Sequence, residues 1–194
     1  TKGERFSPKI ETAIMDLASF FSKCEKALVS SLTEKGHPFR YPVLATTAKN
    51  HTPNMRTVVL RAYDAAEKTF CIYTDARSQK VEEMDHNPSA KILFYDPQQL
   101  LQLVVSVRLI SKIADSDFYA QLPEKLKKDY ATVRAPGTPL EVADTIEYDF
   151  DSGHFVKLIF EAEQFECLKL QRPHHRKGQF SKVHQKWEGR WLIP

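Results

Sequence analysis

The hexapeptide Arg56-Thr57-Val58-Val59-Leu60-Arg61 places two arginines at the ends of a short, mostly β-branched run. A second apolar run ends in Tyr73-Thr74, and the polar turn Ser78-Gln79-Lys80 follows it. Arginine recognises phosphate through several planar donors, lysine acts as a point charge, and a helix N-terminus adds free N–H groups. We therefore expect two neighbouring strands and a helix start to form a pocket for a phosphorylated cofactor.

Short apolar runs continue on both sides of this stretch. Runs rich in Val, Leu, Ile, Phe, Tyr and Thr cover residues 41–47, 56–63, 69–74, 90–95, 100–113 and 155–170. Turn-forming residues separate them, and a loop is expected over residues 134–139. Serial short strands of this kind predict an antiparallel sheet or barrel rather than alternating βαβ units. The fold class is therefore mainly β with flanking helices.

Three helical segments interrupt the strands. A helix is predicted over residues 8–32, with Ser7 as its N-cap and with Ile14, Leu17, Ala18, Phe21, Leu28 and Leu32 on its apolar face. A short helix over 78–86 ends before Asn87-Pro88, and Pro123 divides a third segment over 115–131. The single domain of residues 1–194 then consists of an N-terminal helix (8–35), a barrel core (40–113), a helical segment (114–140) and C-terminal strands with a basic tail (145–194).

The bulk composition is that of an ordinary folded protein, with 42% hydrophobic and 27% charged residues in 194. No apolar run approaches the roughly 20 residues that span a bilayer, and the first residues do not have the pattern of a secretory signal. Cys24, Cys71 and Cys167 are widely spaced, so we expect three reduced thiols and a cytoplasmic location. The net charge of +3 is mild.

Two alternative sites in the C-terminal tail are weaker. His174, His175 and His184 lack a nearby Cys or carboxylate at ligand spacing, so no metal site is expected. The tail also carries six cations and two tryptophans, which is a pattern that nucleic-acid-binding surfaces share. An anionic cofactor explains part of this charge equally well, and a nucleic-acid partner is not expected.

In this order, the signals resemble those of the pyridoxamine 5′-phosphate oxidase family, the FMN-binding split barrels. The family's arginine-bounded signature matches residues 56–61, its Tyr-Thr pair matches Tyr73-Thr74, and its Ser-Arg-Lys turn matches Ser78-Gln79-Lys80. A glutamine at the start of the following long strand matches Gln102. An Arg-x-His-x-Arg motif near the end of the chain matches residues 172–176.

The resemblance implies a six-stranded antiparallel split barrel that forms a homodimer, with FMN in the groove between two subunits and a small-molecule substrate. The residues implied in cofactor binding are Arg56, Thr57, Val58, Val59, Leu60, Arg61, Tyr73, Thr74, Ser78, Gln79, Lys80, Gln102 and Arg176. Those implied in substrate binding are Arg61, Arg172 and His174. No catalytic residue is assigned, because the family's redox chemistry is that of FMN.

The chain departs from the family pattern at several positions. Gln79 replaces a phosphate-binding arginine, and Phe118 and Leu122 fall in a stretch where the family brings polar side chains to the substrate phosphate. Arg134-Ala135 replaces a Gln-Ser pair, and Arg134 is a candidate to restore the missing charge. We therefore expect an FMN-dependent oxidoreductase that acts on a small amine or alcohol other than pyridoxamine phosphate. A non-catalytic flavin carrier, or a split barrel that holds a deazaflavin or haem, stays open.

One geometric question follows from the first signature. Arg56 and Arg61 are five residues apart, and alternate residues of a regular strand face opposite sides of a sheet. The two side chains cannot then reach one ligand from a regular strand. A β-bulge between them, or two different ligands, would resolve this.

Overall fold

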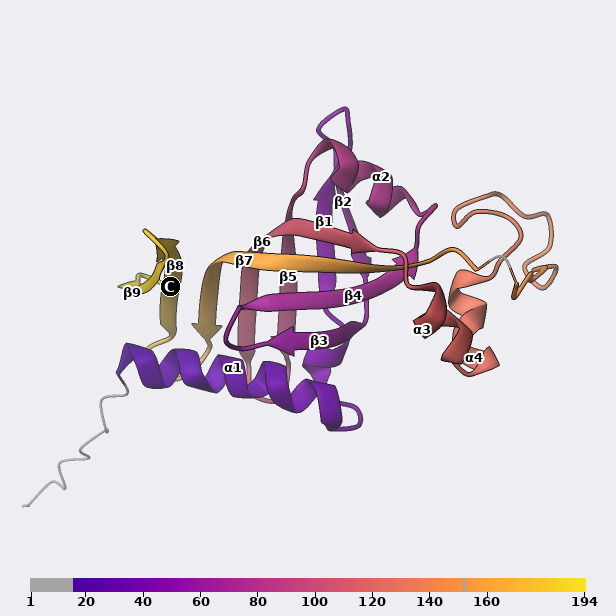
Figure 1. The fold of residues 1–194 in the computed structure, drawn as a ribbon. Coiled ribbons are helices and arrows are strands. Elements are labelled where there is room, and N and C mark those ends of the chain that lie inside the picture. Colours follow the sequence, from indigo (N-terminus) through magenta and orange to yellow (C-terminus); the bar gives the residue numbers. More distant parts are fainter. Residues whose placement is uncertain (1–15, 152) are drawn as a thin grey trace, which may run out of the picture.

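A computed structural model describes residues 16–151 and 153–194, and Figure 1 shows their arrangement. The strands are β1 (Val43–Thr47), β2 (Pro53–Thr57), β3 (Leu60–Asp64), β4 (Thr69–Asp75), β5 (Ser89–Asp96), β6 (Leu101–Ile113), β7 (Phe155–Lys169), β8 (Arg176–Val183) and β9 (Lys186–Leu192). The helices are α1 (Leu17–Thr33), α2 (Gln79–His86), α3 (Ser116–Gln121) and α4 (Glu124–Lys127), with single 3₁₀ turns at Pro38–Arg40 and Lys128–Tyr130.

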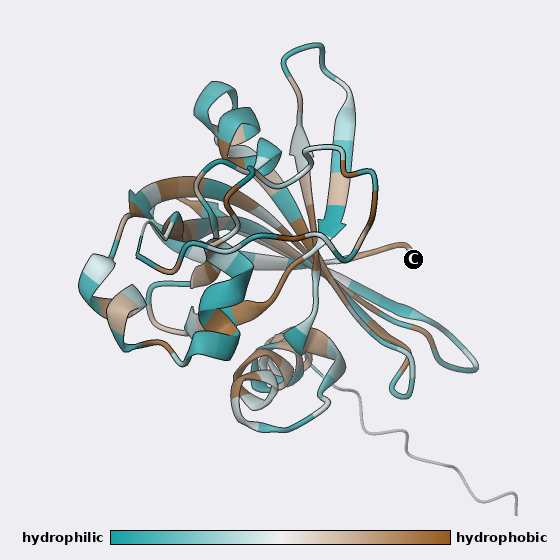
Figure 2. Cartoon of the chain, turned by 90° about the vertical axis from the view of Figure 1, so that its right-hand side faces the viewer, coloured by the Kyte–Doolittle hydropathy of each residue, from teal (hydrophilic) through white to brown (hydrophobic). Residues whose placement is uncertain are grey.

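The strands of the described chain form one antiparallel sheet in the order β2-β1-β5-β6-β7-β4-β3, and β8 and β9 continue from β7 as a hairpin. The predicted antiparallel architecture is confirmed. The sheet has nine strands rather than six, because the predicted strand over residues 56–63 is divided into β2 and β3 and the basic tail folds as β8 and β9. Figure 2 shows that the turns between strands are mostly hydrophilic, as expected for solvated connections.

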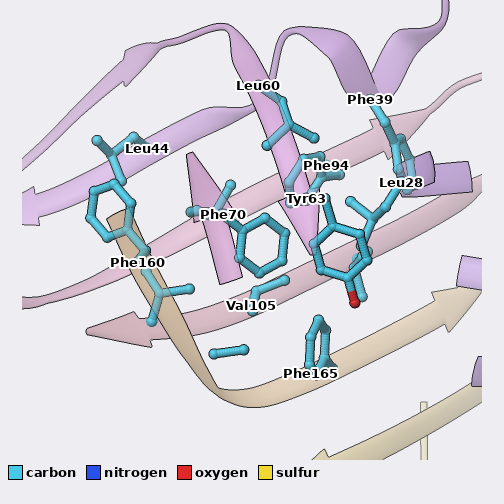
Figure 3. Packing of buried hydrophobic residues seen from close by; sticks show 14 of the residues in the cluster. Leu28, Phe39, Leu44, Leu60, Tyr63, Phe70, Phe94, Val105, Phe160 and Phe165 are labelled. Carbon is cyan, nitrogen blue, oxygen red and sulfur yellow. The ribbon is translucent and has the colours of Figure 1, made fainter. Parts of the chain in front are cut away.

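The core lies inside the curled sheet. Phe70 and Phe94 come from β4 and β5, Phe160 and Phe165 both come from β7, and all four are fully buried. The ring centroids of Phe70 lie 6.0 Å from Phe94 and 6.3 Å from Phe165, within the range of favourable aromatic pairs. Figure 3 shows these rings converging with aliphatic side chains from β1, β3 and β6. Burial that alternates along each strand follows from the two-residue period that the sequence displays.

Helix α1 begins at Leu17, and the Asp16 carboxylate caps it by accepting the Ser19 N–H at 2.8 Å. The predicted continuous helix from residue 8 is wrong at this point, because Asp16 is extended; Ser7, Pro8 and Ile14 lie outside the described residues. The buried stripe also differs from the predicted one: it contains Phe20, Cys24, Ala27, Leu28 and Ser31, whereas Ala18 is exposed.

The chain between the two signature arginines is broken rather than continuous. Strand β2 ends at Thr57 and β3 begins at Leu60, so the predicted single strand over residues 56–63 is wrong. Val58 is buried, and its N–H donates to the Pro42 carbonyl at 2.9 Å, the last bond in register with the β1–β2 pairing before the chain leaves for β3. Strands β2 and β3 therefore occupy the two ends of the sheet order, and Arg56 and Arg61 lie on different strands.

The segment after the barrel follows the prediction closely. Short helices α3 and α4 flank Pro123, as proline's missing N–H requires. A loop then runs to β7, and a single bridge between Thr132 and Tyr148 closes it. Figure 1 shows α3, α4 and this loop extending beyond one end of the barrel, opposite the β8–β9 hairpin.

Candidate functional site

A buried polar cluster lies beneath α2. Strand pairing places Thr46 opposite Asn54 and Leu44 opposite Arg56, so these side chains share the inward face of β1 and β2. Helix α2 packs against β1 and adds Glu83, whose side chain is only 4% exposed. We call Thr46, Asn54, Arg56 and Glu83 the inner cluster.

Hydrogen bonds satisfy the Glu83 carboxylate from three sides. It accepts from Arg56 Nη2 at 3.0 Å, from the Thr46 hydroxyl at 2.5 Å and from the Asn54 amide. Burial alone raises the pKa of Glu83, but these hydrogen bonds and the Arg56 charge outweigh it and hold the pKa below its usual value. Glu83 is therefore an ionised carboxylate bound to the arginine that the sequence assigns to the cofactor.

A second group of predicted residues meets next to the inner cluster, at the junction of β4 and α2. Lys80 Nζ donates to the Thr74 hydroxyl at 2.9 Å, and the hydroxyls of Thr74 and Ser78 lie 3.2 Å apart. Burial lowers the pKa of Lys80, and the neighbouring Arg56 charge lowers it further, against the opposing effect of Asp75 and Glu83. Two cations and two hydroxyls therefore lie together, as the sequence predicts. Gln79, by contrast, is exposed to solvent.

Arg77 is an organising residue that the sequence reasoning missed. Its guanidinium bonds to the Asp75 carboxylate at 2.7 Å and to the carbonyls of Thr132 and Val133 at 2.7 and 3.1 Å. It therefore ties the loop after α4 to the strand end that carries Thr74. The only sequence signal was an acidic residue two positions before an arginine, directly after a predicted strand.

The second signature arginine lies in an aromatic environment on the outer side of the barrel. We call Arg61, Tyr73, Phe118, Tyr130 and Lys157 the outer cluster. Arg61 Cζ lies 5.3 Å from the Tyr73 ring centroid, its Nη2 lies 3.5 Å from the Tyr130 hydroxyl, and its buried Nε has no hydrogen-bond partner. Lys157 Nζ lies 3.9 Å from the Phe118 ring centroid and also pairs with Asp115 at 2.7 Å.

The outer cluster is held together by packing rather than by a buried ion pair. Phe155 lies between α3 and the barrel, and its ring centroid is 5.1 Å from both Tyr73 and Tyr130. Burial raises the pKa of Tyr130, and the nearby Arg61 charge opposes this rise. Tyr130 is a further missed residue, and it offers a hydroxyl to Arg61 where Phe118 cannot.

The remaining predicted residues lie elsewhere in the chain. The pairings of β2 with β1, β1 with β5 and β5 with β6 align Arg56 with Val105 of β6. Gln102 lies three residues before Val105 on the same strand. Because three is an odd number, Gln102 faces outward while Val105 and the Arg56 side chain face inward. One subunit therefore does not bring Gln102 to the cations of Arg56 and Lys80.

The C-terminal motif lies beside the β8–β9 hairpin. Arg176 begins β8 opposite Lys169, and both residues line a small cavity of about 110 Å³ beneath α1. Arg172 and His174 are exposed in the turn before β8.

The residues between the two signature arginines differ in exposure: Val58 and Leu60 are buried, Val59 is half-buried and Thr57 is exposed. Arg134 is exposed and lines a loop cavity of about 740 Å³ over residues 132–147.

Metal-binding and membrane-spanning features are both absent from the described residues. No group of three or more His, Cys, Asp or Glu side chains is arranged to hold a metal ion within residues 16–151 and 153–194. No helix in that part of the chain is long and apolar enough to cross a membrane. The three cysteines are free thiols, and Cys24 and Cys167 are buried.

Comparison with known proteins finds similar sequences and folds. The family model described as the FMN-binding domain of pyridoxamine 5′-phosphate oxidase matches residues 21–110, which include both signature arginines and all of α2. The structure of an FMN-binding protein related to pyridoxamine 5′-phosphate oxidase, from Nostoc punctiforme, superposes with a TM-score of 0.70. It covers 93% of this chain and all of its own, at 23% identity. Over its barrel core the chain is therefore similar to the pyridoxamine 5′-phosphate oxidase family.

Individual relatives show the same similarity. A pyridoxine/pyridoxamine 5′-phosphate oxidase 2 from Arabidopsis thaliana is 28% identical over 67% of this chain and 73% of its own length. An oxidase from Acinetobacter baylyi is 32% identical over 63% of this chain but only 53% of its own. PhzG from Burkholderia lata, in complex with tetrahydrophenazine-1-carboxylic acid, shares the fold with a TM-score of 0.69 over 98% of both chains at 13% identity. The split-barrel prediction is thereby confirmed.

Proposed function

We propose that this chain is a member of the pyridoxamine 5′-phosphate oxidase-like family, binds FMN and acts as an oxidoreductase on a small amine or alcohol, phosphorylated or not. The observation that supports this most directly is the meeting of Arg56, Lys80, Thr74 and Ser78 within the region that the FMN-binding family model matches. Partly buried cations beside hydroxyls at a helix start are the donor set that a phosphate monoester requires.

The residues present fit the phosphate of FMN. Lys80 uses one N–H on Thr74, which leaves two donors for a ligand, and burial of the ammonium strengthens any charge-assisted bond that it makes. The Thr74 hydroxyl can turn its proton from Ser78 Oγ toward an oxyanion, whereas the Ser78 hydroxyl donates to the Asp75 carbonyl at 2.7 Å and supports Thr74 as its neighbour. When bound, FMN supplies the hydride acceptor, and the protein supplies orientation and exclusion of competing reactions.

The outer cluster is the proposed substrate side. Arg61 is partly buried, and no carboxylate of the described chain pairs with it; the Tyr73 ring lies beside its guanidinium. A guanidinium in such a setting binds an anionic or strongly polar substrate group and fixes its orientation. Phe118 and Leu122 pack into the aromatic cluster, and their side chains offer no donor to a phosphate. This supports a substrate other than pyridoxamine phosphate.

We also propose that a second copy of the chain completes the site. Gln102, Arg172, His174 and Arg176 do not meet the Arg56 and Lys80 group within one subunit, and a two-fold partner would supply them. The outward face offers a surface for it: Val43, Leu93 and Val104 align across three strands and are half-exposed. Met55 and Tyr95 nearby are 73% and 44% exposed. Apolar side chains exposed on neighbouring strands are typical of homodimer interfaces.

The visible absorption spectrum of the purified protein tests the cofactor first. FMN is added and free flavin is then washed out. A retained flavin spectrum at near one FMN per chain supports the proposal, and size-exclusion chromatography of the same sample tests the dimer. A protein that keeps no FMN, even at millimolar supply, contradicts the proposal.

Turnover separates an enzyme from a flavin carrier. The FMN-loaded protein is assayed against a panel of small amines and alcohols with dioxygen and other electron acceptors. Arg61→Ala should raise the KM of any substrate found while FMN stays bound; loss of FMN instead would move Arg61 to the cofactor side. Full FMN occupancy with no turnover on the whole panel would favour the carrier, which the apolar packing of Phe118 also supports.

A further inference from the structure

Glu83 is a charged group that the proposed phosphate site does not require. Its carboxylate is buried beneath α2, and the side chains that bind it come from β1 and β2 rather than from its own helix. A buried carboxylate is costly unless it is paired, so its position next to the phosphate-binding cations calls for an explanation.

The charged groups around the proposed phosphate site leave a net positive charge of about one. Asp75 pairs with Arg77, so that ion pair adds no net charge. Arg56 and Lys80 contribute two positive charges, Glu83 removes one, and Gln79 contributes none. A phosphate monoester carries nearly two negative charges at neutral pH, so this site balances only part of them.

Arg56 is also committed to the protein. Its Nη2 bonds to Glu83 at 3.0 Å, and its Nη1 bonds to the Thr46 hydroxyl. These contacts fix the guanidinium in one orientation before any ligand arrives. They also mean that a phosphate must share Arg56 with a carboxylate that already uses part of its charge.

We propose that Glu83 is a positioning residue that holds Arg56 in place and weakens the site's preference for phosphorylated over unphosphorylated flavin. This inference rests on the proposed FMN function. It means that the cofactor phosphate is held mainly by Lys80 with Thr74, which Ser78 supports, and that Arg56 supplies less than a full charge. The Glu83 carboxylate then sets how strongly the site prefers FMN over riboflavin.

Glu83→Gln is the direct test. The glutamine amide oxygen can still accept from Arg56 and Thr46, and the Asn54 amide can turn over so that its oxygen faces the new N–H. Only the charge is lost. FMN affinity should then rise about tenfold, equivalent to about 1.4 kcal/mol, while riboflavin affinity stays within twofold of wild type.

Glu82→Gln is the matched control. Glu82 is the preceding residue of α2, its side chain is 68% exposed, and it faces Lys49 at 3.4 Å rather than the inner cluster. Its removal changes the net charge of the protein by the same amount. The ratio of FMN to riboflavin affinity, measured by flavin fluorescence quenching, should stay within twofold of wild type in this variant because solvent screens an exposed charge.

The outcomes separate this inference from the proposed function. A ratio of FMN to riboflavin affinity that rises in Glu83→Gln but not in Glu82→Gln supports the inference, and an unchanged or lower ratio in Glu83→Gln overturns it.

If wild type binds neither flavin, the proposed function fails. Stabilisation by inorganic phosphate in thermal melts then tests Glu83 alone: a larger rise in Tm is expected for Glu83→Gln than for wild type, and an equal rise contradicts the inference. If Glu83→Gln does not fold, Glu83→Asp withdraws the charge by one methylene and should raise the ratio about threefold; an unchanged ratio contradicts the inference.

Discussion

Arg56 and Arg61 belong to one hexapeptide, yet they lie in opposite environments. Arg56 faces inward, where Glu83 and Thr46 bind its guanidinium. Arg61 faces outward against the Tyr73 ring, and its Nε has no hydrogen-bond partner. The first arginine is part of a satisfied ionic network, and the second is poorly satisfied by the protein. The difference teaches that the pairing of a side chain, more than its place in a motif, decides whether it stabilises the fold or stays available to a ligand.

The largest expected effect comes from breaking the inner pair. Arg56→Ala leaves the buried Glu83 carboxylate without its cation and should lower the free energy of unfolding by about 3 kcal/mol, the low end for a buried pair because Arg56 is 22% exposed. Arg61→Ala should change it by less than about 1 kcal/mol, because no buried carboxylate loses a partner. Urea denaturation of both variants measures the contrast. Equal losses would show that the two arginines play the same structural role.

Arg77 extends the comparison to the loop after α4. Arg77→Ala removes the ion pair of the buried Asp75 and two bonds to carbonyls of the loop, so a loss of about 2 kcal/mol is expected. Hydrogen exchange should accelerate mainly in residues 131–135 and at the end of β4. Arg77→Lys keeps the charge but not the planar fork and should restore only part of the protection. Unchanged exchange in the loop would show that other contacts hold it.

A pair of hydroxyl deletions sharpens the contrast at finer scale. Thr46→Val removes a hydrogen bond from the buried Glu83 carboxylate and one acceptor from Arg56, with an expected cost of about 1.5 kcal/mol. Tyr130→Phe removes only the long 3.5 Å contact to Arg61, and the expected cost is below about 0.5 kcal/mol. Thermal and urea unfolding of the two single variants provide the measurement. A larger loss of stability in Tyr130→Phe than in Thr46→Val would show that the stronger hydrogen-bond network lies in the outer cluster instead.

The smallest expected effect concerns pH. The ammonium form of Lys80 binds phosphate, and burial and Arg56 lower its pKa from 10.5. A lowered pKa means that Lys80 loses its proton at a lower pH than an ordinary lysine. FMN affinity should therefore decrease as the pH is raised, and the decrease, about threefold at first, should begin before the pH reaches 10.5. Lys80→Arg should hold its affinity over the same range, since arginine stays charged. Identical pH profiles for the two proteins would remove Lys80 from the phosphate site.

Much of the framework was predictable from local patterns. The short apolar runs over residues 69–74 and 90–95 predict strands, and β4 and β5 confirm them. Ser78 and Asn87-Pro88 bound α2 as predicted. The proline acts locally, because it cannot continue a helix, whereas the Ser78 hydroxyl donates to the Asp75 carbonyl and not to the helix. The grouping of Thr74, Ser78 and Lys80 follows from the same local geometry, since the strand end and the helix start are only a few residues apart.

Other features were not predictable, because they depend on contacts between distant segments. The run Val58-Val59 favours a strand by propensity, yet the chain turns there so that β2 and β3 can lie at opposite ends of the sheet. In the sequence Glu83 is one of several acidic residues on a polar helix, and nothing local distinguishes it from Glu82 or Asp85. The packing of α2 on β1 buries it against Arg56. Tyr130 reaches Arg61 across 69 residues of sequence.

The sequence by itself determined most of the barrel strands, the position of α2 and the donor types, because apolar runs, turn residues and side-chain chemistry are local properties. The tertiary structure decided which charges meet. It buried Glu83 beside Arg56, placed Arg61 on the aromatic outer face, and separated Gln102 and Arg176 from both. Electrostatic interactions act over a few ångströms and depend on burial, so their partners are fixed only when the sheet closes and α2 packs onto it.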